Sequence, residues 1–288
     1  METSEILKKV RRIEIKTRGL SKNIFAGEYH SAFKGRGMTF SEVREYQYGD
    51  DIRSIDWNVT ARFGHPYIKI FEEERELTVV LLIDVSGSRN FGTISQMKRE
   101  IMTETAATIA FSTIQNNDKI GVIFFSDKIE KFIPPLKGRK HVLHIIREMI
   151  DFKPQSNLTN IAQALKYFTN AIKKSSTAFV LSDFFDTNFE KELIIANRKH
   201  DVVALQIYDV RETEMPNVGL AKFKDAETGE RMWVDTSDKR TRTTYKHRWG
   251  EHQLELRKSF TRSGVDFVSM KTSDDYVRSL MQLFKMRA

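Results

Sequence analysis

The chain has 288 residues, 40% of them hydrophobic and 30% charged, which is the balance of a folded protein with one or two domains. Its formal net charge is +8, and it contains no cysteine, which excludes disulfides, thiolate metal sites and cysteine nucleophiles. The first residues lack the basic start and apolar run of a signal peptide, and no apolar run is long enough to span a bilayer. We therefore expect a cytoplasmic protein without a membrane segment.

From residue 76 onward, the sequence alternates between strand and helix patterns. Apolar, β-branched runs predict strands at 77–83, 120–125, 178–181, 202–207 and 265–268. Apolar residues at helical spacing predict helices at 95–115, 139–150, 160–174 and 189–197. Strands that are apolar on both faces and alternate with helices indicate an α/β fold with a mostly parallel sheet covered on both faces. A turn after Phe125 predicts one antiparallel edge strand near 130–133.

These patterns divide the chain into four parts. Residues 1–75 contain many glycines and aromatic residues and no long periodic element, so we expect an N-terminal segment packed on the core. Residues 76–210 form the core, and residues 211–238 resemble a small β-hairpin inserted into it. Residues 239–288 are expected to supply C-terminal helices and the last strand of the core.

A basic run lies in the predicted helix that begins near Lys239. It extends to Arg248 and raises nucleic acid as an alternative partner. We favour a solvated helix face for this run, because clustered charge on a helix most often faces water.

The motif with the clearest chemistry follows the first core strand directly. Here Asp84, Ser86 and Ser88 offer one carboxylate and two hydroxyls from a short loop. In an open α/β sheet, ligands bind at the carboxyl ends of strands, and oxygen donors of this kind suit Mg²⁺ or Mn²⁺, with Ca²⁺ as a further alternative. A metal held by one carboxylate would keep positive charge and attract another anion. The alternative is that Asp84 and Ser88 satisfy turn amides and cap the next helix.

Two further loops at strand ends carry compatible ligands. Thr159 precedes the helix that begins near residue 161, and Asp183 follows the strand 178–181. Each could instead serve as a cap or turn residue, and Asp186 could take the place of Asp183. The coincidence of three loops favours a metal site over three separate caps.

Together these five residues resemble the metal-ion-dependent adhesion site of von Willebrand A domains. The resemblance implies a von Willebrand A-like (Rossmann-like) fold and a Mg²⁺ bound by Asp84, Ser86, Ser88, Thr159 and Asp183. It also implies that an acidic side chain of a partner completes the metal shell. The sequence departs from the family at Arg89, where a methionine is common. An inward-pointing Arg89 would weaken metal binding, whereas an outward-pointing Arg89 could recruit an acidic partner.

The segment before the first core strand resembles the bacterial family called domain of unknown function 58. The resemblance rests on the motifs at 35–40, 44–46, 48–51 and 53–57 and on the acidic run 71–76. Genes of this family commonly lie beside a gene for a MoxR-type AAA+ ATPase. The resemblance therefore implies an adaptor or chaperone-like partner of that ATPase.

The residues of this segment also have simpler explanations. We expect its aromatic side chains to be packing residues, namely Tyr46, Tyr48 and Trp57. Its charged cluster is either a salt-bridged loop or a docking surface for the ATPase, formed by Asp50, Asp51, Arg53 and Asp56.

Enzymatic alternatives are less well supported by the sequence. A phosphatase with Asp84 as nucleophile would normally have a second acid two residues later, where Ser86 stands. Ser86 also lacks the preceding glycine of a nucleophile elbow, and no histidine lies in a metal-protease motif. We therefore predict a non-enzymatic, metal-dependent protein-interaction module, with a metal-dependent hydrolase or a nucleic-acid-binding protein as alternatives.

Overall fold

The structure is a computed structural model that describes residues 8, 11–14, 39–72, 77–92 and 97–287. The chain divides into two compact units, each with a β-sheet of its own. The smaller unit comprises Lys34–Leu77, and the larger comprises Met1–Phe33 and Thr78–Ala288.

The smaller unit is built on an antiparallel hairpin of β1 (Thr39–Glu45) and β2 (Tyr67–Glu72). The connection between them holds the 3-10 helix η1 (Ile52–Ser54) and the helix α3 (Trp57–Phe63). Helix α3 ends at Gly64, whose φ of 74° is a left-handed conformation that glycine adopts without strain. The sequence predicted no long element here, because strands joined by a long connection depend on pairing that no local pattern reveals.

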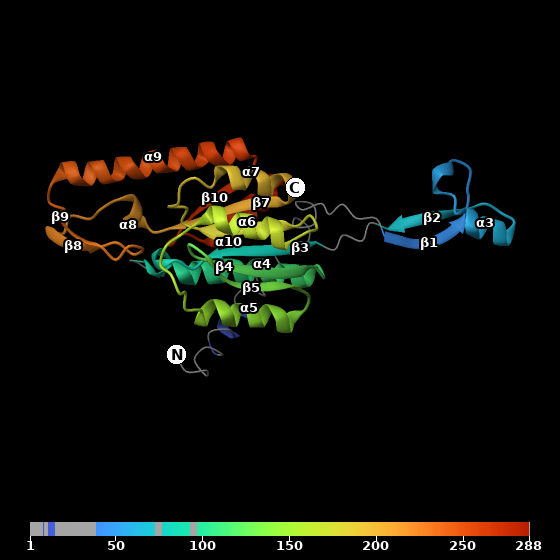
Figure 1. Cartoon of the computed structure of the whole chain (residues 1–288), viewed down its shortest axis with the longest axis horizontal. Helices are drawn as coiled ribbons and strands as arrows, with labels where there is room; N and C mark the ends of the chain where they lie inside the picture. The colour runs from blue at the N-terminus through green and yellow to red at the C-terminus, as the bar shows by residue number, and fades with distance from the viewer. Residues whose placement is uncertain (1–7, 9–10, 15–38, 73–76, 93–96, 288) are drawn as a thin grey trace. The chain divides into compact units, whose positions relative to one another are not determined.

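The larger unit is built on a six-stranded sheet in the order β10-β7-β6-β3-β4-β5 (Figure 1). In chain order its strands are β3 (Thr78–Asp84), β4 (Lys119–Phe125), β5 (Ile129–Leu136), β6 (Thr177–Ser182), β7 (Asp201–Tyr208) and β10 (Asp266–Lys271). All neighbours are parallel except β4 and β5, which confirms the predicted antiparallel edge strand. If the six strands are numbered 1 to 6 in chain order, from β3 to β10, their order across the sheet from β5 to β10 is 3-2-1-4-5-6, which is the doubly wound order. The winding reverses between β3 and β6.

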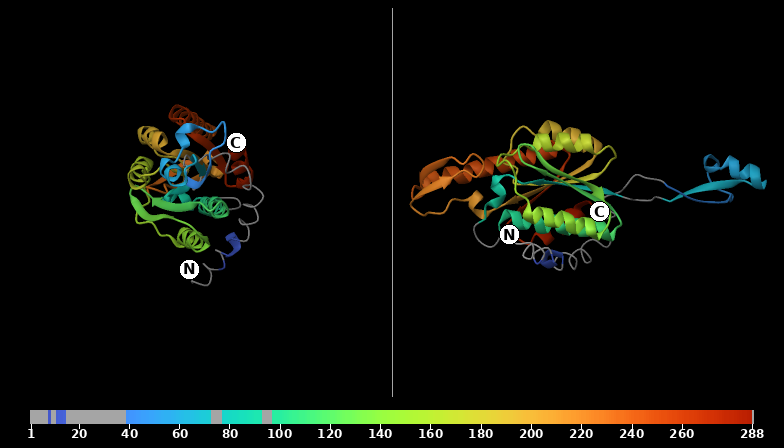
Figure 2. Two further views of the ribbon diagram at one scale, coloured as in Figure 1. Left: turned by 90° about the vertical axis from the view of Figure 1, so that its right-hand side faces the viewer. Right: turned by 60° about the horizontal axis from the view of Figure 1, so that its bottom comes forward.

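Helices cover both faces of this sheet (Figure 2). One face is covered by α6 (Ile161–Ala171), α7 (Glu190–Lys199) and α9 (Lys239–Ser263). The other is covered by α4 (Lys98–Gln115), α5 (Arg139–Asp151) and α10 (Tyr276–Arg287). Strand β3 is apolar on both faces and therefore needs helices on both sides of the sheet. Val80 and Leu82 pack in the core cluster under α6, α7 and α9, and Val79 and Leu81, which point to the other face, are equally buried. The predicted fold class is therefore confirmed.

The predicted hairpin insertion is also present in the larger unit. It consists of the short helix α8 (Val210–Thr213) and the strands β8 (Leu220–Lys224) and β9 (Arg231–Asp235). The two strands pair only with each other and form a two-stranded sheet separate from the main one. They lie beside the N-terminal part of α9 (Figure 1).

Candidate metal centre

The candidate site lies where the winding of the main sheet reverses. Asp84 is the last residue of β3, and Asp183 follows the last residue of the neighbouring strand β6. In doubly wound sheets, the crevice beyond the carboxyl ends of such neighbouring strands is where ligands bind. Both side chains are buried, with 1% of Asp84 and 2% of Asp183 exposed.

The loop after β3 is held in a fixed conformation by Asp84. The backbone amide of Ser86 donates to Oδ1 of Asp84 at 2.9 Å, and the hydroxyl of Ser182 donates to Oδ2 at 2.7 Å. The hydroxyl oxygens of Ser86 and Ser88 lie 3.1 Å apart, so both point toward the same place. The structure therefore brings the three residues of the motif together, with Asp84 fixing the loop and the two hydroxyls converging.

The second loop is joined to the first through the backbone. The amide of Gly87 donates to the carbonyl of Asn157 at 2.9 Å. This bond places the segment containing Thr159 beside the loop of residues 85–88, which we call the serine loop. The Thr159 hydroxyl donates at 2.7 Å to Oε1 of Glu227, a residue between β8 and β9. The hydroxyl oxygen of Thr159 keeps lone pairs that could bind a cation.

The third loop carries Asp183, and a lysine already contacts it. The Lys98 ammonium is fully buried and donates to Oδ2 of Asp183 at 2.7 Å and to Oε1 of Glu212 at 2.5 Å. Lys98 is the first residue of α4, and Glu212 lies in α8. The other oxygen of Asp183 accepts a longer bond of 3.4 Å from the amide of Phe185.

Asp186, the alternative for the third loop, has another role in the structure. Its Oδ2 accepts a hydrogen bond from the backbone amide of Ile161 at 2.7 Å, and its Oδ1 accepts one from Thr187 at 2.7 Å. Asp186 thus satisfies an amide at the start of α6, where a helix leaves its first amides without internal partners.

Burial and the charge of Asp183 make Asp84, Glu212 and Glu227 hard to ionise, and the pKa of each is raised. Burial, followed by the charge of Asp183, raises the pKa of Asp84 to about 7. Burial also raises the pKa of Glu212 and of Glu227, and the charge of Asp183 acts in the same direction on both. Although burial opposes it, the carboxylates of Asp183 and Glu212 raise the pKa of Lys98 above its ordinary value. One ammonium thus stands among several carboxyl groups, and a divalent cation would offset their remaining charge.

The donors fit a hard divalent cation. Within the described ranges, no group of three or more His, Cys, Asp or Glu side chains could hold a metal ion. This finding does not bear on the hydroxyl donors, which make up three of the five predicted ligands. Ser86, Ser88 and Thr159 would coordinate the ion, and Asp84 and Asp183 would bind it directly or through water, with Asp84 also orienting the loop that carries the two serines.

Arg89 does not reach the surface in this structure. Only 5% of it is exposed, and its Nη2 donates to the carbonyl of Phe152 at 2.7 Å. Burial, followed by the charge of Arg99, lowers the pKa of Arg89 to about 10. The guanidinium points into the protein, so this conformation does not offer it to an acidic partner.

The charged cluster of the smaller unit is largely occupied by local contacts. Asp50 forms a bidentate ion pair with Arg44, at 2.8 and 2.9 Å. Asp51 caps η1, and Asp56 caps α3 and lies 3.5 Å from the ammonium of Lys69. The backbone amide of Arg53 donates to Asp51, and this arginine is exposed. These contacts support the salt-bridged loop among the two predicted alternatives.

The aromatic residues of the smaller unit differ from expectation. Tyr48 is fully exposed and 68% of Trp57 is exposed, although both were predicted to be packing residues. Only Ile68 appears among the buried core residues of β1, η1, α3 and β2 whose side chains are described. A unit this small has little interior in which to bury large side chains.

Three residues of the site carry no recognisable signal in the sequence. Glu212 and Glu227 come from segments far from the motif in the chain, whereas Lys98 begins the helix that follows it, and each resembles an ordinary charged surface residue in the sequence. Their meeting depends on where α4, α8 and the turn between β8 and β9 lie. A buried lysine is rare unless it is paired, so its burial is what identifies it in the structure.

The strand order and the converging loops define a von Willebrand A-like α/β domain with a candidate metal centre where the winding reverses. The chain belongs to the family described as "Protein of unknown function DUF58", which matches residues 42–255. The resemblance predicted from the sequence is thereby confirmed.

The chain is also similar to particular proteins. It is 27% identical to the uncharacterized protein Rv1480 of Mycobacterium tuberculosis, over 96% of this chain and 88% of that protein. An aerotolerance-related membrane protein from Bacteroides fragilis is 13% identical, with a TM-score of 0.50 over 73% of this chain and 99% of that chain. The SpRpn10 VWA domain is 14% identical, with a TM-score of 0.40 over 73% of this chain and 95% of that chain. The Bacteroides protein shows a shared fold alone. Among the described residues, no helix has the length and hydropathy needed to cross a membrane.

Proposed function

We propose that this chain is a non-enzymatic protein-interaction module that binds an acidic side chain of a partner through a divalent cation. The cation is Mg²⁺, with Mn²⁺ or Ca²⁺ as alternatives, and its ligands are Asp84, Ser86, Ser88, Thr159 and Asp183. The observation that carries the proposal is the convergence of the two serine hydroxyls beside two buried aspartates where the winding of the sheet reverses. A cation bound mainly by neutral hydroxyls keeps positive charge, which attracts a carboxylate.

The geometry of Asp84 supports binding over catalysis. Both of its carboxylate oxygens accept hydrogen bonds, from the Ser86 amide and the Ser182 hydroxyl. A nucleophilic aspartate needs an oxygen that is free to attack a substrate. Asp84 is better placed to fix the loop than to form a covalent intermediate.

We propose a MoxR-type AAA+ ATPase as the partner, because the chain belongs to a family whose genes commonly lie beside genes for such ATPases. In this proposal an acidic side chain of the ATPase completes the metal shell. The chain would act as an adaptor or chaperone-like partner of the ATPase.

Calorimetric titration with Mg²⁺ tests the metal site. Wild type should bind Mg²⁺, and an Asp84→Ala, Ser86→Ala variant should lose binding. The matched control is Ser273→Ala, Asp274→Ala, which removes an exposed serine and aspartate and should bind as wild type does. Equal Mg²⁺ affinity in wild type and the Asp84, Ser86 variant would refute the proposed site.

Co-purification with a MoxR-type ATPase from the same genome tests the partner. Association should weaken in EDTA and in the Asp84, Ser86 variant. Association that survives both changes would separate partner binding from the metal centre.

A further inference from the structure

The turn between β8 and β9 lies directly on the loop of the candidate metal centre. A Cβ atom added to Gly87 would lie 2.1 Å from the carbonyl oxygen of Ala226, so the absence of a side chain at Gly87 lets the turn approach. Asp225 shapes this turn by accepting hydrogen bonds from the amides of Glu227 and Thr228, at 2.9 and 2.7 Å. The turn is therefore ordered by its own contacts and held against the serine loop.

Glu227 is the residue of this turn that faces the site. From Asp225 to Glu230 it alone is partly buried, while the other residues of the turn are exposed. Its carboxylate accepts the hydroxyl of Thr159, which is one of the proposed ligands. A partly buried carboxylate that accepts a hydrogen bond from a neutral hydroxyl is costly unless a cation lies nearby.

We infer that Glu227 supplies, from the chain's own hairpin, the carboxylate that completes the metal centre. This inference rests on the proposed function and changes how a partner would reach the site. An acidic side chain of a partner must displace Glu227, and with it the tip of the hairpin. The tip of the hairpin is thus an autoinhibitory cover, and the carboxylate of Glu227 is replaced by the partner's carboxylate when the partner binds.

The hairpin is built in a way that allows such an exchange. Its two strands pair only with each other, and an isolated two-stranded hairpin is only marginally stable. Met232 and Trp233 of β9 are each 64% exposed, so β9 is weakly anchored to the rest of the unit.

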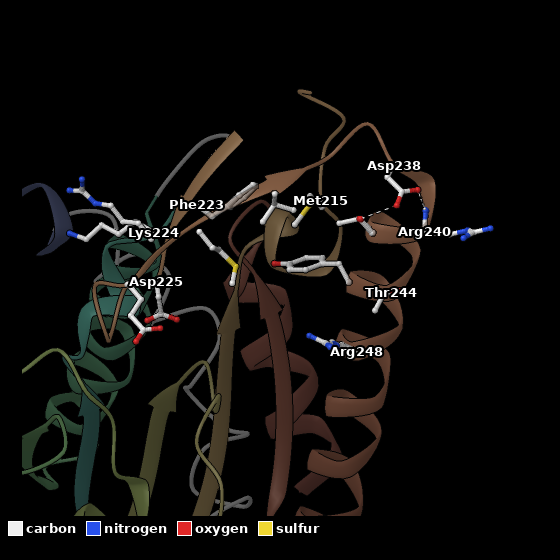
Figure 3. A pocket seen from close by; sticks show the side chains of 14 residues that line it. Met215, Phe223, Lys224, Asp225, Asp238, Arg240, Thr244 and Arg248 are labelled. Carbon is white, nitrogen blue, oxygen red and sulfur yellow. Dashed lines mark hydrogen bonds between the residues drawn. The ribbon is translucent and has the colours of Figure 1, made fainter. Parts of the chain in front are cut away.

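A groove separates the hairpin from α9. Its volume is about 760 Å³, with Phe223 and Lys224 on the hairpin side and Thr244 and Arg248 on the side of α9 (Figure 3). This space leaves room for the hairpin to move without unfolding α9.

The test measures Mn²⁺ affinity of the full chain by calorimetry. Glu227→Gln should weaken Mn²⁺ binding about tenfold or more, as loss of a carboxylate at a metal site does. The matched control is Glu230→Gln, which makes the same change in an exposed residue of the same turn and should leave the affinity unchanged. In Glu227→Ala, which leaves space for a small anion, added acetate should restore much of the Mn²⁺ affinity, and acetate should have no such effect on wild type.

A second variant moves the hairpin without removing any proposed ligand. Gly87→Ala places a methyl group against the carbonyl of Ala226 and should push the tip away, with a similar loss of Mn²⁺ affinity and a similar rescue by acetate. In wild type, Mn²⁺ should also slow hydrogen exchange in residues 220–235, and in Glu227→Gln it should not.

The outcomes separate this inference from the proposed function. If wild type binds Mn²⁺ and the Glu227 variants bind it equally well, the role of Glu227 is refuted and the metal centre stands. If wild type binds no Mn²⁺, the proposed function and the role of Glu227 are both refuted.

Discussion

The buried ammonium of Lys98 gives a prediction whose size can be worked out from the structure. Lys98 is 0% exposed and makes two short ion pairs, with Asp183 and Glu212. Lys98→Met keeps an unbranched side chain of similar length and removes the charge. Breaking a buried ion pair by removing one partner costs about 3–5 kcal/mol, because the remaining carboxylates are left uncompensated.

Thermal unfolding at pH 8, without added divalent cation, measures this loss. In a domain of this size, 1 kcal/mol shifts Tm by about 2–4 °C, so Tm of Lys98→Met should fall by roughly 6–20 °C. The control is Lys246→Met, the same change at an exposed position of α9, where the free energy of unfolding should change by no more than about 0.5 kcal/mol. If the Tm of Lys98→Met stays within the range of this control, Lys98 does not compensate the carboxylates.

The same variant has a predicted dependence on pH and on metal. Burial raises the pKa of Glu212 and the charge of Lys98 lowers it, so the substitution raises that pKa further. A carboxyl group whose pKa is raised in the folded state lowers the free energy of unfolding as pH rises. The loss of stability in Lys98→Met relative to wild type should therefore shrink as pH falls. Mg²⁺ should raise Tm of Lys98→Met more than it raises Tm of wild type, since the ion replaces the missing positive charge.

Three further changes test the site. Ser182→Ala removes the hydroxyl that donates to Asp84 at 2.7 Å, and urea unfolding should show a loss of about 1–3 kcal/mol. The pKa of Asp84 is raised from 3.8 to about 7, so without divalent cation the free energy of unfolding should decrease as pH rises through this interval. For the same reason, Mg²⁺ affinity measured by calorimetry should rise with pH through about 7, and a flat profile would contradict the burial of Asp84 in the folded state. Asp183→Asn should lower Mg²⁺ affinity about tenfold or more, whereas Asp186→Asn should lower stability and leave that affinity unchanged.

Much of the main sheet could be read from local sequence patterns. The strand β3 is a continuous apolar run because both of its faces are buried under helices, and that pattern needs no knowledge of distant residues. The motif of Asp84, Ser86 and Ser88 could be placed for the same reason, since it follows that strand directly. Asp183 could be added because parallel strands end at one edge of a sheet. Thr159 was also expected in a strand-end loop, but it lies in the connection between α5 and α6, which reaches the site through the hydrogen bond from Gly87 to Asn157.

The charges that complete the site could not be read in this way. Lys98 and Asp183 are 85 residues apart in the chain, and Lys98 and Glu212 are 114 residues apart. Helical spacing identifies the apolar face of a helix, and it does not identify a lysine that is buried because two carboxylates surround it. The prediction that Tyr48 would be a packing residue failed for a related reason, because a pattern of aromatic residues does not show how large an interior its unit can form.

Two of the three residues that the sequence did not reveal, Lys98 and Glu227, have opposite effects on the proposed centre. Lys98 places a fixed positive charge beside Asp183, which lowers the affinity of the site for a cation. Glu227 places a further carboxylate beside Thr159, which raises that affinity. Lys98 is fully buried at the start of a long helix, whereas Glu227 stands on a turn whose other residues are exposed. The centre therefore combines a permanent internal cation with an anion that can leave, and the movable anion is the component that a partner's carboxylate can replace.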